Sequence, residues 1–130
     1  MYKRQEVAGP VATALASLTL RGRCLVAAGG RLHVSEAVRR YGVALVEATR
    51  RSPDLRLGAS PRAGLQLLRA ARATAALAGR DHVLPDDVQA MAVPVLAHRL
   101  LLTPDAALAR RDTQRVVTDL LATVPVQHGR

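Results

Sequence analysis

Ser60, Pro61 and Arg62 are the residues of this sequence best suited to binding an anion. Serine is a favourable residue to precede a helix, because its hydroxyl accepts a hydrogen bond from a free N–H group of the first turn. Proline is favourable at the first helical position, where its missing N–H group costs nothing. The sequence therefore predicts a helix that begins at Pro61 and carries Arg62 in its first turn.

The charge of Arg62 is not stabilised by its own helix in this position, since the helix dipole already makes the first turn positive. A phosphate group would change this, because free N–H groups at a helix N-terminus and a guanidinium both bind its oxygens. The alternative, which the spacing alone favours, is a solvated arginine at a helix end. Ser60 could also be proposed as a nucleophile, but its role as a helix cap fully explains a serine at this position.

A long helix must carry Arg62, and the sequence predicts it from residue 61 to about residue 78. Gly79 follows at the position where a glycine in the left-handed conformation commonly ends a helix. The apolar face is rich in small residues, so a neighbouring helix can approach closely; it comprises Gly64, Leu67, Leu68, Ala71, Ala75 and Ala78.

Two further helices flank this one in the sequence. The first follows Ser35 as its N-cap and stops at Pro53. The second begins near Pro85, and Pro94 is expected to kink or split it. Their apolar faces repeat with helical spacing and comprise Val38, Tyr41, Leu45 and Ala48 in the first, and Val88, Met91, Ala92, Val95 and Leu96 in the second.

The segments that follow these helices are predicted to be less regular in structure. Residues 100–102 are expected to form a strand-like segment or a buried helix end, followed by a turn at residues 103–104 and a linker over residues 106–111. A last helix, capped by Asp112 or Thr113 and ended by Pro125, has the apolar face Val116, Val117, Leu120, Leu121 and Val124. A helix over residues 11–20 is also considered.

The composition indicates one small all-α domain. The chain has 130 residues, 49% of them apolar, with two tyrosines and neither Phe nor Trp. The core must therefore be built from Leu, Val and Ala, which favours closely packed helices, and we expect a small bundle of about four or five. The single Cys24 cannot form an internal disulfide, and no apolar run reaches the ~18 residues of a membrane span, so a cytoplasmic protein is expected.

Several motifs in order resemble the C-terminal lid subdomain of MoxR-family AAA+ ATPases. The resemblance begins with A-T-R-R-S-P-D-L-R-L-G-A-S-P-R-A at residues 48–63 and L-L-R-A-A-R-A at residues 67–73. It continues with G-R-D-H-V at residues 79–83, P-D-D-V at residues 85–88 and P-V-L-A-H-R-L at residues 94–100. Residues 120–125 also resemble the end of MoxR proteins, so the chain is expected to finish at the natural terminus.

The resemblance implies a role for Arg62. In that family the arginine of the G-A-S-P-R motif is the sensor-2 residue, which reaches the γ-phosphate of ATP bound with Mg²⁺ on a larger subdomain. Ser60, Pro61 and Arg62 would then form the lid's contribution to the nucleotide site. Residues 31–130 would be the lid, and residues 1–30 a poorly defined segment at the junction with the missing ATPase core.

The resemblance also implies partners. The complete protein would assemble as a ring, a hexamer, and use ATP for chaperone-like remodelling of other proteins, often ones with von Willebrand factor A domains. This chain, however, lacks the G-x-x-x-x-G-K-[ST] motif and the acidic strand that would hold Mg²⁺. It is therefore expected to be inactive alone and to bind no nucleotide firmly.

No metal site is expected. His33, His82, His98 and His128 lack the paired spacing of a zinc site. The adjacent Asp86 and Asp87 fit the first turn of a helix better than a metal site, because their charge complements the helix dipole. Cys24 lies in an apolar run, which is typical of an inert buried thiol.

The net charge of +9, almost all from arginine, leaves two other functions open. A basic helical module could bind nucleic acid through Arg39, Arg40, Arg50, Arg51, Arg69 and Arg72. The lack of stacking aromatic residues and of a clear recognition helix argues against this function. A purely structural domain that docks a protein partner through its alanine-rich helix faces is the third possibility.

Overall fold

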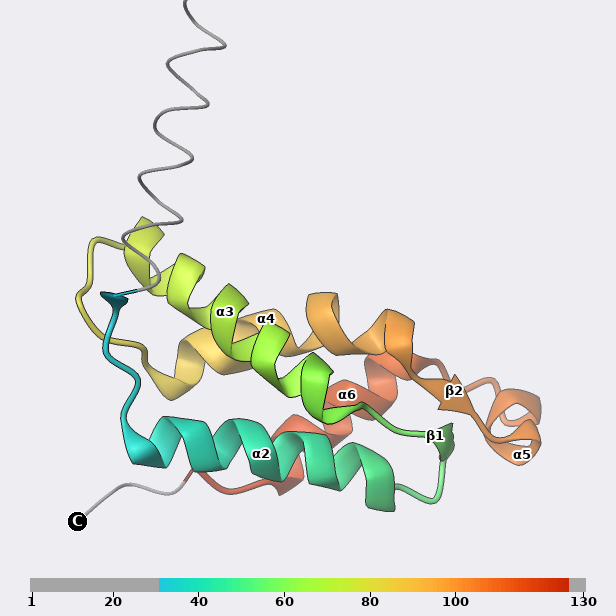
Figure 1. The fold of residues 1–130 in the computed structure, drawn as a ribbon. Helices are drawn as coiled ribbons and strands as arrows, with labels where there is room; N and C mark the ends of the chain where they lie inside the picture. Colours follow the sequence, from blue (N-terminus) through green and yellow to red (C-terminus); the bar gives the residue numbers. More distant parts are fainter. Residues whose placement is uncertain (1–30, 127–130) are drawn as a thin grey trace, which may run out of the picture.

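Residues 31–126 form a bundle of five α-helices with one small sheet in the computed structural model (Figure 1). The predicted all-α class is confirmed. The elements are, in chain order, α2 (Glu36–Arg51), β1 (Leu55–Leu57), α3 (Pro61–Leu77), α4 (Pro85–Leu96), the 3₁₀ turn η1 (Ala97–Arg99), β2 (Leu101–Leu102), α5 (Pro104–Leu108) and α6 (Thr113–Thr123). The considered helix over residues 11–20, Cys24 and His128 lie outside the described residues.

Side-chain caps begin four of the helices. Ser35, Ser60, Thr103 and Asp112 each accept a hydrogen bond from the backbone N–H three residues later. The first two caps confirm the predicted starts, and Asp112 is the cap of the last helix. Thr103 was expected only in a turn, and its cap begins α5 where we predicted an irregular linker.

The core lies where α3 packs against α4. Ala63, Leu67, Ala71 and Ala75 recur at every fourth position of α3 and have no exposed surface. They face a matching series on α4, which comprises Val88, Ala92 and Leu96. Tyr41 of α2 completes the core, with its hydroxyl accepting a hydrogen bond from Gln89 Nε2 at 3.1 Å. The predicted alanine-rich contact is thereby confirmed.

Pro94 does not split α4, which runs on to Leu96 before it tightens into η1. Proline removes a single backbone donor, the one that would bond the carbonyl of Ala90 four residues earlier. Ala90 is exposed, so water can reach that carbonyl. Of the two predicted effects of Pro94, a kink or a split, the split does not occur, because the missing bond falls at an exposed residue.

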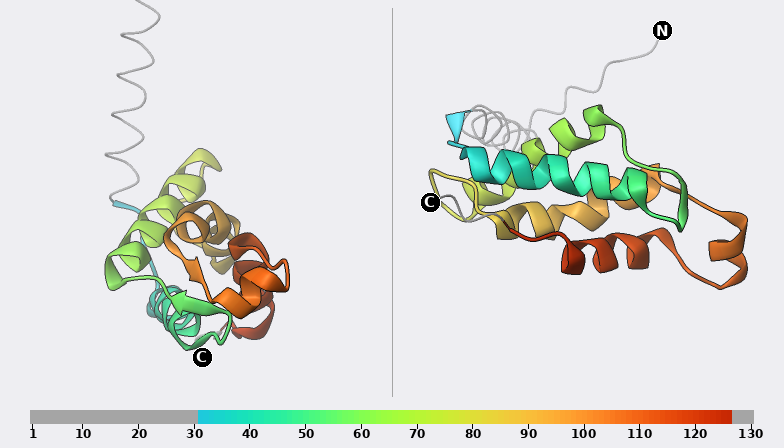
Figure 2. Two further views of the ribbon diagram at one scale, coloured as in Figure 1. Left: turned by 90° about the vertical axis from the view of Figure 1, so that its right-hand side faces the viewer. Right: turned by 90° about the horizontal axis from the view of Figure 1, so that it is seen from below.

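β1 and β2 pair antiparallel, with Leu55 opposite Leu102 and Leu57 opposite Leu101. The two strands and α5 form one end of the bundle, which faces the viewer in the left view of Figure 2. Residues 100–102 were expected to be strand-like or a helix end, and the strand alternative is the correct one. β1 was not predicted, because it has only three residues.

Two helices end in the same backbone motif with different residues. At the end of α3, Gly79 N–H bonds Ala76 O and Arg80 N–H bonds Ala75 O, both at 3.0 Å, with Gly79 at φ +71°. At the end of α5, Arg110 N–H bonds Ala107 O and Arg111 N–H bonds Ala106 O, again both at 3.0 Å. Arg110 there has φ +54°, so a side chain occupies a position that favours glycine.

We expect Arg110→Gly to raise the free energy of unfolding by about 1 kcal/mol, because glycine adopts a positive φ without steric cost. The reciprocal change, Gly79→Ala, should lower it by about 1 kcal/mol; a Cβ at Gly79 meets no atom within 4 Å, so only backbone strain is added. Urea denaturation of both variants measures the two effects. Destabilisation by Arg110→Gly would contradict this account.

Candidate functional site

Ser60 and the first turn of α3 have the geometry that the sequence predicts. Ser60 Oγ accepts a hydrogen bond from Ala63 N–H at 3.3 Å, and Ser60 O accepts from the same group at 2.9 Å. Pro61 is the first residue of the helix, and Arg62 lies in the first turn. The backbone at this end of α3 is therefore fixed, which gives the Arg62 side chain a defined origin.

Thr49 connects this segment to α2 from inside the protein. Its side chain is buried; Oγ1 donates to Val46 O at 2.6 Å and accepts from Ala59 N–H at 2.9 Å. Ala59 directly precedes the Ser60 cap and is itself buried. A single hydroxyl therefore ties the last turns of α2 to the start of α3.

Gly58 permits the close approach on which this arrangement depends. A Cβ added at Gly58 would lie 2.7 Å from both Cα and N of Arg50, a distance that real contacts do not reach. Because the obstructing atoms belong to the backbone, they cannot move aside as a flexible side chain would. Glycine is thus required at the first position of the Gly-Ala-Ser-Pro-Arg segment for contact rather than for turn formation.

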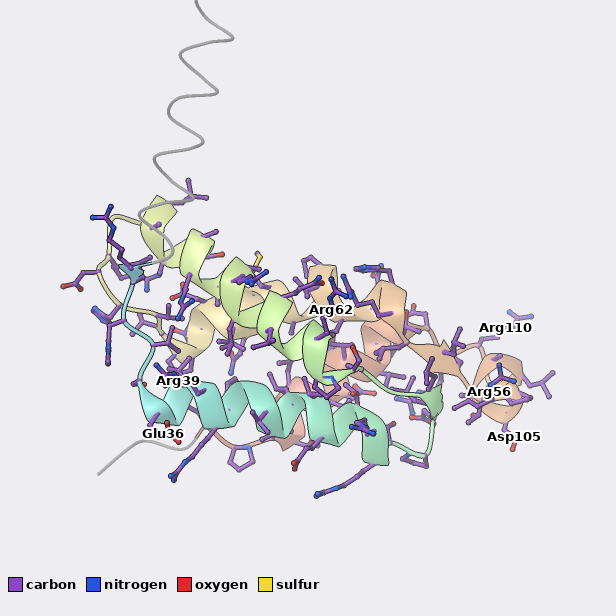
Figure 3. All side chains as sticks on the ribbon, viewed as in Figure 1. Glu36, Arg39, Arg56, Arg62, Asp105 and Arg110 are labelled. Atoms are coloured by element: carbon purple, nitrogen blue, oxygen red, sulfur yellow. The ribbon has the colours of Figure 1, made fainter. Side chains whose placement is uncertain are left out.

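Arg62 is an exposed cation at the beginning of α3 (Figure 3). Within residues 31–126 it takes part in no ion pair. α3 contains no acidic residue, whereas Arg69 and Arg72 add two more cations further along it. The N-terminal turn therefore combines a guanidinium with the positive end of a 17-residue helix, an arrangement suited to an anion.

A shallow apolar groove lies between α2 and α3 beside this turn. It has a volume of about 390 Å³ and includes Pro61 and Leu65 from the first turns of α3. Val43 and Leu65 border it and are 56% and 61% exposed. Glu47 and Arg50 supply its charged side chains, both from the second half of α2. The groove presents apolar surface close to Arg62 that the described residues leave uncovered.

Asp87 is a structural carboxylate. Its side chain is only 5% exposed and binds the guanidinium of Arg80 through two contacts, of 2.7 and 2.5 Å. It also accepts a hydrogen bond from Leu84 N–H at 2.8 Å, which caps α4. The hydrogen bonds from Arg80 hold the pKa of Asp87 below its usual range, against the effect of burial. Its predicted role at the helix start holds, but the partner Arg80 was not foreseen.

Two of the four histidines, which lie far apart in the sequence, are neighbours through their backbones. His33 and His82 form an isolated parallel bridge through their backbones, and His82 Nδ1 lies 2.8 Å from the exposed Asp81 carboxylate. In the region from residue 31 to residue 126, no three His, Cys, Asp or Glu side chains gather in a group that could hold a metal ion. No helix among these residues is long and apolar enough to cross a membrane.

The arginines considered for nucleic-acid binding do not behave as one set. Arg40 pairs with Glu36 at 3.1 Å and Arg51 pairs with Glu47 at 3.3 Å, each one helical turn apart. Arg111, which sequence reasoning did not select, binds Asp54 at 3.2 Å and also Asp119, and so joins the loop between α2 and β1 to α6. Part of the positive charge is therefore neutralised locally.

Comparison with known proteins identifies matches over most of this fold. The profile of the AAA lid domain family matches residues 47–120. MoxR from Paracoccus denitrificans is 40% identical over 126 residues, which cover 84% of this chain and 37% of that protein. Chaperone MoxR1 from Mycobacterium tuberculosis is 40% identical over 100 residues, which cover 70% of this chain and 26% of that protein.

A solved structure agrees with these matches. The crystal structure of a protein from Cytophaga hutchinsonii, assigned as an ATPase, superposes with a TM-score of 0.73 at 29% identity. The match covers 78% of this chain and 33% of that one. The chain spans about a third of the length of the curated relatives it matches, between 26% and 37% for the three longest alignments.

We expect Thr49→Val to lower the free energy of unfolding by about 1–3 kcal/mol, because it leaves the buried Ala59 N–H without an acceptor. Thr49→Ser keeps the hydroxyl and should cost clearly less. Denaturant unfolding gives the stabilities, and hydrogen exchange at the Ala59 amide reports the bond directly. Equal protection of Ala59 in both variants would show that this hydroxyl does not hold the segment.

Acid should weaken the fold in part through Asp87. Because its pKa is lowered in the folded state, Asp87 contributes stability that is fully present above pH about 4, and this stability is lost as pH falls below that value through the lower pKa of the folded state. Asp87→Asn should therefore be less stable at pH 7 by about 1–3 kcal/mol and lose less stability between pH 6 and about pH 3. Thermal unfolding across this range measures both effects.

Asp86→Asn is the matched control, since Asp86 is an exposed carboxylate in the same turn. Asp81 also has a pKa below its usual value, owing to the His82 side chain, so wild type and Asp86→Asn should share a residual acid sensitivity with Asp87→Asn. Identical pH profiles for all three proteins would refute the assignment to Asp87.

Proposed function

Because the chain belongs to the AAA lid domain family, we propose that it is the lid of a MoxR-like AAA+ ATPase and that Arg62 senses the γ-phosphate of ATP. The ATP would be bound by a larger subdomain that this chain does not contain. In this proposal the lid closes over the nucleotide and brings Arg62 to the phosphate. Arginine suits this role because its planar, forked donors match several phosphate oxygens at once.

The proposal is supported chiefly by the exposure of Arg62 and its lack of an ion-pair partner among the described residues. It is exposed at the start of a helix that has no acidic residue, and it has no ion-pair partner in the part of the chain that the structure describes. A cation held at the positive end of a helix is stabilised when an anion arrives. The fixed backbone around Ser60 and Ala59 limits the positions that its guanidinium can reach.

The residues present fit only one part of a nucleotide. Arg62 and the first turn of α3 fit a phosphate, whereas Mg²⁺ needs oxygen ligands that the described residues do not gather in a group. Bound ATP would supply the phosphoanhydride to be cleaved. The contribution of this chain is then to bind and orient the terminal phosphate through Arg62, with Ser60 and Pro61 fixing the helix that carries it.

The groove between α2 and α3 supports closure against the larger subdomain. Val43 and Leu65 leave apolar surface uncovered next to the Arg62 turn, and such surface is stabilised by burial against another domain. We propose that part of the larger subdomain covers this groove when the lid closes. The larger subdomain would then contact the groove at the same time as Arg62 binds the phosphate.

The complete ATPase would use this closure for chaperone-like remodelling within a ring of subunits. The names of the relatives support this part of the proposal, since one of them is a chaperone. A hexameric ring and clients with von Willebrand factor A domains follow from the family resemblance. A cytoplasmic location is part of the same proposal.

Arg62→Ala in the complete ATPase that carries this lid should lower ATP turnover by about 100-fold or more, because a cation that stabilises the transition-state charge is lost. Arg69→Ala is the matched control, an exposed arginine seven residues further along the same helix. Arg62→Lys should recover only part of the rate, since lysine lacks the forked geometry. Turnover and unfolding are measured for each variant; unchanged turnover of a folded Arg62→Ala protein would contradict the role.

A further inference from the structure

The end of the bundle opposite the start of α2 carries a second surface, which is separate from the Arg62 turn. It is formed by Arg56 and Leu57 of β1, Leu101 of β2, Leu108 of α5, and Arg110; we call these five residues the tip surface. Figure 3 shows Arg56 and Arg110 at this end of the molecule, with Asp105 beside them, and Arg39 at the other end.

The apolar part of the tip surface is exposed to water. Leu57 and Leu101 are 54% and 47% exposed, and Leu108 is 83% exposed. Leu57 and Leu101 are register partners next to an irregularity between Leu55 and Leu57, and the side chains of both are exposed. The sheet therefore holds two leucines side by side in contact with water, an arrangement typical of an interaction site.

Arg110 adds an independent observation. It occupies a left-handed position at the end of α5, although the same motif at the end of α3 uses Gly79. A glycine at position 110 would relieve the backbone but would remove the side chain. Residues held in this conformation are enriched at functional sites, and Arg110 lies at the same end of the molecule as Arg56 (Figure 3).

The charge of the tip surface limits what can bind it. In the stretch from residue 31 to residue 126, neither Arg56 nor Arg110 takes part in an ion pair, although Asp105 lies at the same end of the molecule (Figure 3). A second copy would bring like charges together. Nucleic acid would satisfy the arginines but leave the leucines exposed, and these five residues offer no aromatic ring for a base to stack on.

We propose that the tip surface binds an acidic protein segment that carries aliphatic side chains. The leucines of the tip surface would bury the aliphatic side chains, and Arg56 and Arg110 would pair with flanking carboxylates. This binding does not depend on the role proposed for Arg62. It gives the domain a docking site for another protein in addition to any contact with nucleotide.

The probe is a soluble synthetic peptide in which leucines alternate with pairs of glutamates, titrated into the isotope-labelled 130-residue chain. Two matched peptides serve as controls, one with lysine in place of glutamate and one with serine in place of leucine. We expect the first peptide to cause saturable NMR shifts at the methyl groups of Leu57, Leu101 and Leu108. Neither control peptide should produce them.

Variants of the chain test the same surface. Leu108→Ser should weaken binding by about 10-fold or more, and Arg56→Ala or Arg110→Gly by about 2- to 5-fold each. Arg110→Gly is expected to be more stable than the wild type, so its weaker binding cannot reflect unfolding. Arg39→Ala, at the opposite end of the molecule, is the control and should leave the affinity unchanged.

Four results would overturn the proposal. They are equal binding of the lysine peptide, shifts that map away from the tip surface, no saturable binding up to about 2 mM peptide, and tip-surface shifts caused more strongly by a DNA oligonucleotide or by self-association of the chain. Because the Arg62 turn is not involved, Arg62→Ala should bind the peptide as the wild type does.

Discussion

The contact between α3 and α4 is the constraint on which the rest of this structure depends. Ala63, Ala71 and Ala75 leave so little side-chain volume that the two helices pack along their lengths with no exposed surface between them. This contact fixes the axis of α3, and therefore the direction in which its N-terminal turn points. The short segment from Leu55 to Ser60 has only to reach the start of a helix already held in place.

Thr49 and Gly58 then fix the position of the start of α3. The Thr49 hydroxyl hydrogen-bonds Val46 O of α2 and Ala59 N–H of the following segment, and Gly58 leaves room for that segment to lie against α2. Neither residue contacts the solvent face where Arg62 lies. The arginine thus lies on a support formed by neighbouring backbone, the buried Thr49 side chain and the Ser60 cap, while its own guanidinium forms no ion pair in the described part of the chain.

The sequence predicted the structure well where it depends on interactions between residues close together in the chain. Ser35, Ser60 and Asp112 act on N–H groups only three residues away, so the starts of three helices could be predicted, as could the Gly79 ending and the apolar faces. Pairings between distant residues left no local signal. β1 exists only because Leu55 and Leu57 meet a strand over 40 residues later. Nothing in the types of Thr49 and Ala59 indicates that they bond, and the opposite charges of Arg80 and Asp87 do not distinguish this pair from other pairs of arginine and aspartate. α5 was missed because a helix of five residues has almost no periodicity.

An alanine-rich core also shapes how the fold responds to temperature. The heat-capacity change of unfolding grows with the apolar area that unfolding exposes, and alanine exposes far less than phenylalanine or leucine. The core at the α3–α4 contact includes four alanines, and the chain has no Phe or Trp. The curve of free energy against temperature is consequently flatter than for an aromatic core of equal length, so that stability changes only gradually on either side of its maximum.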